Sequence, residues 1–283
     1  MPIPVSIIGR STAPVTHELD AEWLAGFATS VGDTQPGDGL TAHPLFPVCI
    51  EWPSVIAAAR LDDGALTADE RRRGVHATHD LTIHRPLRAD DVLTTTATVE
   101  ALEPRRRGTM ERLRLDTRDA AGALVTTTVM GSLFLGVEID GAQAPPNPKP
   151  DRAATAPPTE AIIELAVAAD QAHVYSEGSR IWNPIHTDAT AAQRAGLPEP
   201  ILHGTCTLAM ATSAALDWAR TADEAIATTN AVHRVHARFA GMVLMPSTLA
   251  LHVARPSARE LRFEVFDGHG VAVVRGGLLT LTI

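Results

Sequence analysis

The residues best suited to chemistry lie in the segment Tyr175–Met210. Asn183-Pro184 is a turn signal, because proline fixes its own φ and biases the preceding residue away from the helical region. His186 follows this rigid corner, and His203-Gly204 precedes an apolar stretch typical of a helix. A histidine can exchange protons near neutral pH, and the unpaired N–H groups of a helix start can hold an oxyanion. The segment therefore predicts a site that moves protons beside a polarised carbonyl.

The chain around this segment divides into two halves. Residues 137–160 hold six prolines among small and polar residues and lack a periodic apolar pattern, which is typical of a linker. We therefore expect an N-terminal unit at 1–137, a linker at 138–160 and a C-terminal unit at 161–283. Each unit is long enough to bury its own core.

The two halves repeat the same order of elements. Two helices are expected before four strands in each half. The expected helices are 18–31 and 47–60, then 168–178 and 201–220; the expected strands are 76–83, 92–102, 112–116 and 124–135, then 232–239, 248–254, 260–266 and 271–283. This order predicts an α+β fold in which an antiparallel sheet wraps around a long helix, twice. Strands near the join are expected to pair across the halves, because pairing removes exposed edges.

Residues Ser179–His186, followed by Gly196-Leu197 and Ile201–Gly204, resemble a family signature. The family is that of the MaoC-like, R-specific enoyl-CoA hydratases (hydratase 2), whose pattern runs S-G-D-x-N-P-x-H, then A-G and I-L-H-G. The first half resembles the degenerate amino-terminal repeat of the two-domain eukaryotic hydratases at the segments 43–48, 75–76, 85–87 and 132–135. The fold implied by the resemblance is a double hotdog.

The resemblance implies an activity and assigns roles. The implied reaction is the reversible addition of water to a trans-2-enoyl thioester, with coenzyme A supplied as part of the substrate and no other cofactor or metal. His186 matches the catalytic histidine, Asn183 the asparagine that shapes the loop, and Gly204 the residue whose amide polarises the thioester carbonyl. The first half would supply the acyl-chain pocket, and a homodimer is expected by analogy.

One position departs from the family pattern. The family aspartate, five residues before the histidine, is Ile181, and the preceding glycine is Arg180. The reaction uses two protonatable groups, each contributing roughly 10²–10⁴-fold, and isoleucine can neither accept nor donate a proton. Four alternatives stay open: another carboxylate takes its place in the mechanism, His186 works alone at a reduced rate, the reaction differs, or activity is lost. The candidate substitute acids are Glu51, on the corresponding helix of the first half, and Asp188.

Four side chains beside the motifs are candidates for substrate binding. Ile181 is expected to contact the substrate, Trp182 and the neighbouring Tyr175 are expected in the core or in the pocket wall, and His203 is expected to pack or hydrogen-bond at the helix start. Arg180 either pairs with a nearby loop or approaches a phosphate or thioester. Two other function classes stay open: an acyl-CoA-binding homologue without turnover, and a changed reaction such as thioester hydrolysis or a cyclising addition.

Composition excludes several classes of protein. An apolar fraction of 45% indicates a globular chain, and a net charge of −9 leaves no basic surface for a nucleic acid. No apolar run approaches the roughly 18 residues needed to cross a membrane, and the N-terminus does not resemble a signal peptide, so we expect a cytoplasmic protein. Cys49 and Cys206 lack metal-site spacing and are expected to be buried thiols.

Histidines 76, 79 and 84 raise the question of a metal site. Imidazole is a common metal ligand, but residues 76 and 79 of a regular strand point to opposite faces of the sheet. They could share one ion only if a bulge interrupted the strand. No metal is therefore expected. The arginine runs 71–73 and 105–107 are expected in solvated loops.

Overall fold

The computed structural model describes residues 2–33, 40–141, 158–222 and 232–282. The first half contains η1 (Val5–Ile7), β1 (Val15–Glu18), α1 (Ala21–Ser30), α2 (Pro47–Ala58), α3 (Ala68–Arg72), β2 (Gly74–Ile83), β3 (Val92–Arg105), β4 (Gly108–Asp119) and β5 (Leu124–Leu135). The second half contains β6 (Ala161–Val167), α4 (Gln171–Ser179), η2 (Pro184–His186), α5 (Ala189–Arg194), α6 (Gly204–Ala222), β7 (Val232–Phe239), β8 (Ser247–Ser257), β9 (Glu260–Phe266) and β10 (Ala272–Leu281).

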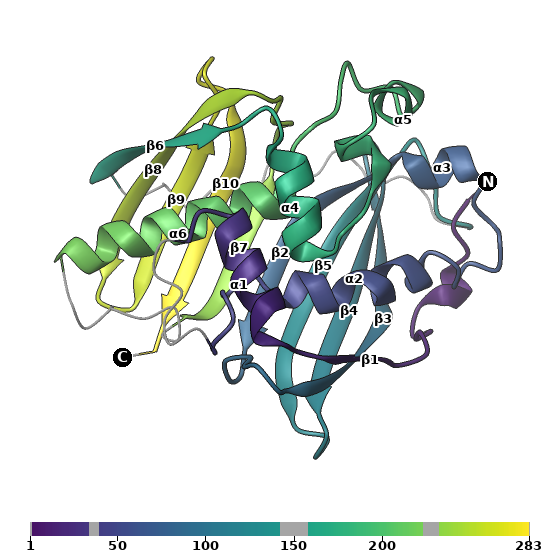
Figure 1. Ribbon diagram of the computed structural model, residues 1–283. Helices are drawn as coiled ribbons and strands as arrows, with labels where there is room; N and C mark the ends of the chain where they lie inside the picture. The colour runs from purple at the N-terminus through teal and green to yellow at the C-terminus, as the bar shows by residue number, and fades with distance from the viewer. Residues whose placement is uncertain (1, 34–39, 142–157, 223–231, 283) are drawn as a thin grey trace.

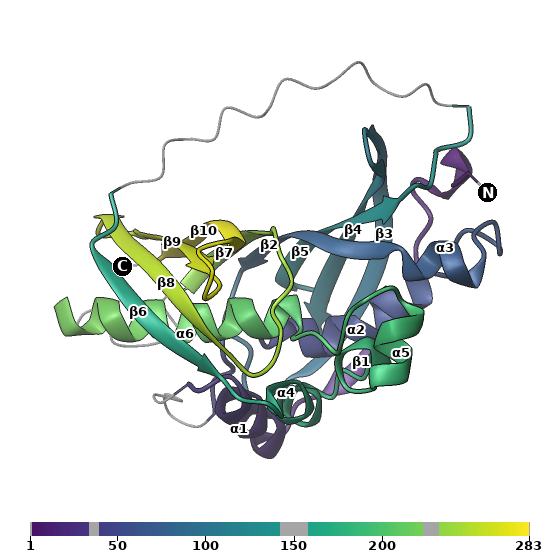
Figure 2. The same ribbon diagram turned by 90° about the horizontal axis from the view of Figure 1, so that it is seen from above.

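The strands form one antiparallel sheet that crosses both halves. Its order is β1-β3-β4-β5-β2-β7-β10-β9-β8-β6, so β2 and β7 meet at the centre (Figure 1). Outward from this seam, each half presents its strands in the same order, which supports the predicted repeat. Seen from above, the long helices α2 and α6 lie on the same side of the sheet (Figure 2). The predicted α+β arrangement, with strands paired across the halves, is confirmed.

Each half also begins with an edge strand that the sequence did not predict. β1 spans only Val15–Glu18 and pairs with β3, and β6 spans Ala161–Val167 and pairs with β8. The tetrapeptide VTHE is too short to display a clear alternation, and AIIELAV follows directly on the expected linker. The two strands occupy the outer edges of the sheet.

The seam holds the two halves in a fixed register. β2 and β7 pair from Thr78 opposite Arg238 to Thr82 opposite Arg234. On the solvent side, the Arg234 guanidinium donates two hydrogen bonds, of 2.7 and 2.6 Å, to the carboxylate of Asp80. On the helix side, Leu81 and its partner Val235 are fully buried in a core shared by both halves.

Two shorter helices, α1 and α4, pack against each other beneath the seam. A Cβ at Gly178 would lie 2.7 Å from the Gly26 carbonyl oxygen, so only glycine permits this close crossing. The amide of Gln171 donates a 2.8 Å hydrogen bond to the Ser30 carbonyl. The N-termini of α2 and α6 point toward this central region (Figure 1). Residues from both halves therefore converge there.

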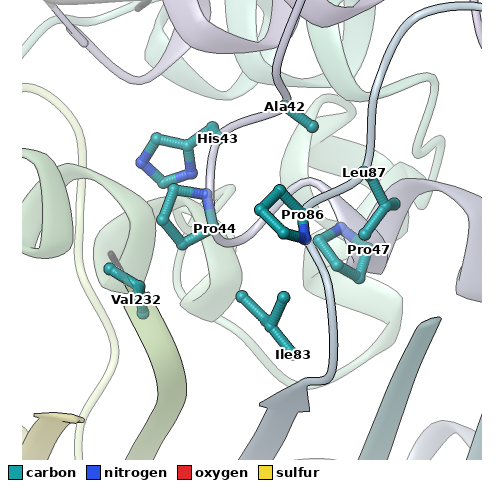
Figure 3. A pocket seen from close by; sticks show the side chains of 8 residues that line it. All are labelled: Ala42, His43, Pro44, Pro47, Ile83, Pro86, Leu87 and Val232. Atoms are coloured by element: carbon teal, nitrogen blue, oxygen red, sulfur yellow. The ribbon is translucent and has the colours of Figure 1, made fainter. Parts of the chain in front are cut away.

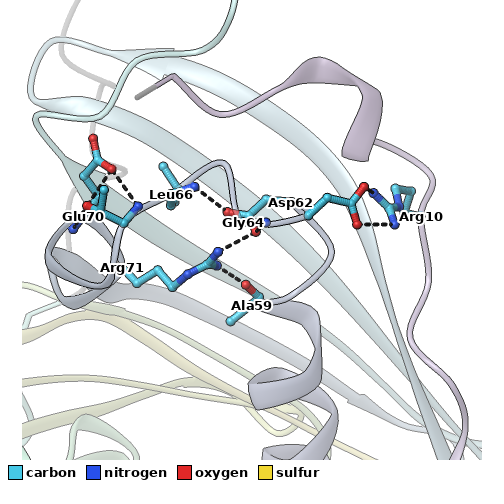
Figure 4. Close-up of polar contacts among 9 residues, drawn as sticks. Arg10, Ala59, Asp62, Gly64, Leu66, Glu70 and Arg71 are labelled. Carbon is cyan, nitrogen blue, oxygen red and sulfur yellow. Dashed lines mark hydrogen bonds and ion pairs between the residues drawn. The ribbon is translucent and has the colours of Figure 1, made fainter.

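The turn after α2 binds Arg71, the first residue of the arginine run 71–73. The Asp62 carboxylate accepts hydrogen bonds from the amides of Gly64 and Leu66, at 3.1 and 3.0 Å (Figure 4). The Arg71 guanidinium donates to Asp62 and to the Ala59 carbonyl. These contacts give Arg71 a structural role.

The described residues bear on two further predictions. Cys49 and Cys206 are free and buried, as expected. The predicted linker overlaps residues 142–157, which lie outside the described residues. Ile3 pairs with Ile139, so part of the segment 138–141 belongs to the first half.

No helix of the described residues is long and apolar enough to span a membrane.

The seam yields a stability prediction. Replacing Leu81 by alanine should lower the free energy of unfolding by about 2–5 kcal/mol, because the cavity would open in the core that both halves share. Denaturant unfolding followed by circular dichroism measures the change. The matched control is Val75→Ala on the same strand, where the side chain is 45% exposed. A loss for Leu81→Ala no larger than that of the control would contradict a shared core at the seam.

Candidate active site

The loop that carries His186 is fixed by local hydrogen bonds. Asn183 precedes η2, and its side-chain oxygen accepts a hydrogen bond from the Ile185 amide at 3.4 Å. His186 ends this short helix, and its Nδ1 lies 2.7 Å from the Ile201 carbonyl oxygen. Because a carbonyl oxygen only accepts, Nδ1 carries the proton. The Nε2 lone pair of the neutral ring is then available to accept a proton.

Burial keeps this imidazole neutral. Desolvation lowers the pKa of His186 to about 4, although the hydrogen bond to Ile201 opposes the shift. The ring stacks on that of His203, with 3.7 Å between centroids and 27° between planes. A charge on either ring would be repelled by a charge on the other. The site therefore holds a neutral imidazole at physiological pH.

His203 is buried and contacts two rings. Its ring packs against that of Tyr175, with 4.9 Å between centroids, and also stacks on that of His186. The Tyr175 hydroxyl lies 2.9 Å from the Thr205 hydroxyl. Neither ring nitrogen of His203 has a hydrogen-bond partner among the described residues. The predicted packing at the helix start is present, whereas the alternative of a hydrogen bond is not.

Gly204 begins α6. A Cβ at this position would lie 3.1 Å from the ring of Phe239, so glycine allows this ring to pack against the helix start. On the Cβ side of Gly204, Phe239 therefore occupies the space that a ligand could otherwise enter. The amide N–H of a first helical residue has no intrahelical acceptor. It is therefore available to a carbonyl oxygen.

The two positions that depart from the family pattern have structural roles. Ile181 is 5% exposed and belongs to the main core. Arg180 ends α4 with φ +57°, in the left-handed region that favours glycine. Its guanidinium lies 4.1 Å from the centroid of the Trp23 ring and 3.7 Å from Asp20. Of the two alternatives for Arg180, pairing with a neighbouring segment is the one observed.

Two other predicted site residues lie at the surface. Asp188 caps α5 by accepting a 2.7 Å hydrogen bond from the Ala191 amide, and it is exposed. The expectation that Asp188 substitutes for the missing aspartate is not supported by this position, because its carboxylate already satisfies the helix start. Trp182 is 51% exposed, which excludes the core alternative, and its place in a pocket wall stays a prediction.

Glu51 is the remaining candidate acid. It lies on α2, is 3% exposed, and accepts a 2.6 Å hydrogen bond from the Thr128 hydroxyl. Burial raises its pKa to about 7, although the bond to Thr128 opposes the shift. A carboxyl group with such a pKa can donate or accept a proton near neutral pH.

His76 and His79 correct one geometric expectation. The register of β2 against β5 shifts between His76 and Thr78, which marks a bulge. The two rings lie 5.6 Å apart, so the expectation of opposite faces is wrong. His76 also lies 4.7 Å from the Phe239 ring, beside the start of α6. No group of three or more residues suited to bind a metal occurs in the described ranges.

A small apolar cavity lies where β2 ends. Its volume is about 10 Å³, room for about one water molecule. Its lining, shown in Figure 3, is Ala42, His43, Pro44, Pro47, Ile83, Pro86, Leu87 and Val232. His43 faces away from solvent and lies 3.1 Å from the Ser213 hydroxyl. The cavity joins the starts of α2 and β7, but it has no room for an acyl chain as it stands.

Solved structures establish the fold class. A MaoC-like dehydratase from Phytophthora capsici superposes with a TM-score of 0.80 at 21% identity, covering 98% of this chain and 97% of that one. A Mycobacterium tuberculosis protein described as having a double hotdog fold gives a TM-score of 0.65 at 15% identity, over 98% of this chain and 96% of that one. The protein is a double hotdog.

Sequence comparison then establishes the family. Residues 145–272 match the family described as MaoC like domain, and residues 6–128 match the FAS1-like, dehydratase domain region. The 3-hydroxyacyl-thioester dehydratase Y of Mycobacterium tuberculosis is 30% identical over 233 residues, 75% of each chain. A probable enoyl-CoA hydratase 2 of Dictyostelium discoideum is 22% identical over 75% of this chain and 74% of that protein. The chain belongs to the MaoC-like dehydratase family.

The geometry of His186 can be tested without a substrate. We expect nitrogen-15 NMR to show a proton on Nδ1 and a lone pair on Nε2 from about pH 8 down to pH 5, because the Ile201 carbonyl fixes the tautomer. Protonation should follow near the lowered pKa of about 4. A His186 midpoint near 6.5, the ordinary value for histidine, or a proton on Nε2, would contradict the geometry.

Proposed function

We propose that this protein catalyses the reversible hydration of an α,β-unsaturated acyl thioester, with coenzyme A as the carrier. The observation that carries the proposal is the pairing of a neutral His186, whose Nδ1 is held by Ile201, with a helix start whose amide N–H belongs to Gly204. The names of relatives, 3-hydroxyacyl-thioester dehydratase and enoyl-CoA hydratase, support this substrate class.

The proposed chemistry assigns one task to each group. The Gly204 amide donates to the thioester carbonyl oxygen and stabilises the negative charge that develops there. His186 Nε2 takes a proton from water as the water oxygen bonds to the β-carbon. The second proton-transfer group donates a proton to the α-carbon, and exchange with solvent then removes the proton from His186 and restores the one on that group, which completes the addition of water. Dehydration follows the same steps in reverse.

A second proton-transfer group is proposed at Glu51. Isoleucine at position 181 cannot serve, and the carboxylate of Asp188 caps a helix. Glu51 is a buried carboxyl whose pKa is raised toward neutrality, and no cation pairs with it in the described structure. Its hydrogen bond to Thr128 holds it against the inner face of β5. The homodimer, the cytoplasmic location and the first-half acyl pocket stay predictions.

The activity is tested with crotonyl-CoA and longer enoyl-CoAs. The conjugated absorbance should fall in the presence of the protein, and His186→Ala should lower the rate by about 10²–10⁴-fold, because the base is lost. His173→Ala, at an exposed position of α4, is the matched control and should keep the wild-type rate. An unchanged rate in His186→Ala would rule out the proposed base.

The role of Glu51 requires a separate pair of variants. Glu51→Gln keeps an oxygen that can accept from Thr128 but cannot transfer a proton, so hydration should slow by about 10²-fold. Glu111→Gln is the matched control, because burial also raises the pKa of that carboxyl to about 7 and Glu111 lies on β4. Adding Ile181→Asp to Glu51→Gln should restore part of the rate. Full activity in Glu51→Gln would contradict the assignment.

Binding without turnover is the second candidate function. The observation that favours it is Ile181, whose burial in the core leaves the family's acidic position apolar. Measuring free thiol beside the absorbance separates the classes: hydration leaves the thioester intact, hydrolysis releases coenzyme A, and a binding protein shows affinity with neither signal. Calorimetric titration with saturated acyl-CoAs measures that affinity.

A further inference from the structure

His79 is a buried imidazole that the proposed chemistry does not use. It lies on β2, opposite Met130 of β5 and Ala237 of β7, and is 2% exposed. It shares the helix-facing side of the strand with Leu81 and Ile83, as the alternating burial shows. Neither of its ring nitrogens has a hydrogen-bond partner among the described residues.

A series of contacts connects His79 with the helix start at Gly204. The bulge in β2 brings the His76 ring to 5.6 Å from that of His79. The His76 ring lies 4.7 Å from that of Phe239, and Phe239 packs against Gly204. Two ring contacts and the packing of Phe239 against Gly204 thus connect His79 to the residue whose amide is proposed to bind the thioester carbonyl.

A second set of neighbours connects His79 with Glu51. Thr128 is opposite Leu81 in the register of β2 and β5, and is therefore a diagonal neighbour of His79, within reach of long side chains. The Thr128 hydroxyl donates to the Glu51 carboxyl. Glu51, Thr128, His79 and His76 together form a line of polar side chains across the buried face of the sheet, which we call the polar strip.

The unpaired imidazole of His79 is costly for the fold alone. A buried polar group without a hydrogen bond destabilises a protein, whereas an apolar ring of similar shape at the same place would not. Its neighbours across the sheet, Met130 and Ala237, offer no side-chain oxygen or nitrogen. A bound group that donates and accepts hydrogen bonds would remove the cost.

We propose that the polar strip is a subsite for a hydroxyl group carried on the acyl chain of the thioester substrate. The proposal rests on the proposed function, which places the thioester carbonyl at Gly204. A neutral imidazole offers one donor and one acceptor, and a hydroxyl group is complementary to both. Burial lowers the pKa of both His76 and His79, so an ionic group would find no opposite charge on these rings. The substrate class is therefore a hydroxylated enoyl thioester.

Binding of saturated acyl-CoAs tests the subsite independently of turnover. Calorimetric titration would compare straight-chain acyl-CoAs with ω-hydroxyacyl-CoAs of the same length, over a series of short and medium chains. The wild type should bind the hydroxylated compound at least about tenfold more tightly at one or more lengths, because His79 gains its missing partner. Equal affinities at every length would overturn the subsite.

Three variants separate binding from structure. His79→Phe should lose the preference for the hydroxyl group while circular dichroism and the melting temperature stay unchanged or improve. His79→Gln keeps a donor and an acceptor and should retain part of the preference. It replaces the phenylalanine variant as the test if that variant does not fold. His252→Phe is the matched control, because this ring lies on β8 against Phe266. A preference that survives in His79→Phe would overturn the proposal.

The outcomes distinguish this inference from the proposed function. A protein that hydrates enoyl-CoAs but shows no hydroxyl preference has the proposed activity and lacks the subsite. A protein that prefers hydroxyacyl-CoAs through His79 but hydrates none has the subsite and lacks the proposed activity.

Discussion

The antiparallel pairing of β2 with β7 is the interaction on which the rest of the structure depends. Five residue pairs join the two halves, from Thr78 opposite Arg238 to Thr82 opposite Arg234. A slip of one residue would turn every inward side chain of β2 to the solvent, including Leu81 and His79. The same register sets Phe239 beside His76 and against the start of α6. The site is therefore built across the seam, from elements of both halves.

The departure from the family pattern involves two adjacent residues that act together. Ile181 extends the core where the family has an acid, and Arg180 adopts a left-handed conformation where the family has glycine. The strain of a non-glycine residue there is of order 1–2 kcal/mol, and the contact of Arg180 with Trp23 can offset part of it. The loop thus presents His186 next to an apolar side chain and an arginine, where the family pattern has an acid and a glycine.

Periodicity predicted the fold well because most strands alternate and both long helices are apolar, whereas single local events escaped it. The bulge at His76 reverses the alternation of side chains along β2, and no residue pattern predicted it. The capping role of Asp188 depends on where α5 begins, and the sequence places that boundary poorly. His186 and Gly204 could be named from the sequence because the motif fixes their spacing, and their catalytic roles stay predictions. His79 was seen as a metal candidate, but its lack of hydrogen-bond partners is a property of the packed core.

The central claim is that water adds to the β-carbon of a thioester that stays intact. The most direct test is incubation of crotonyl-CoA with the protein in water enriched in oxygen-18, followed by mass spectrometry. The account predicts 3-hydroxybutyryl-CoA with the label on the hydroxyl oxygen, formed about 10²–10⁴-fold more slowly with His186→Ala. Label in a free carboxylic acid, released with coenzyme A, would contradict the account.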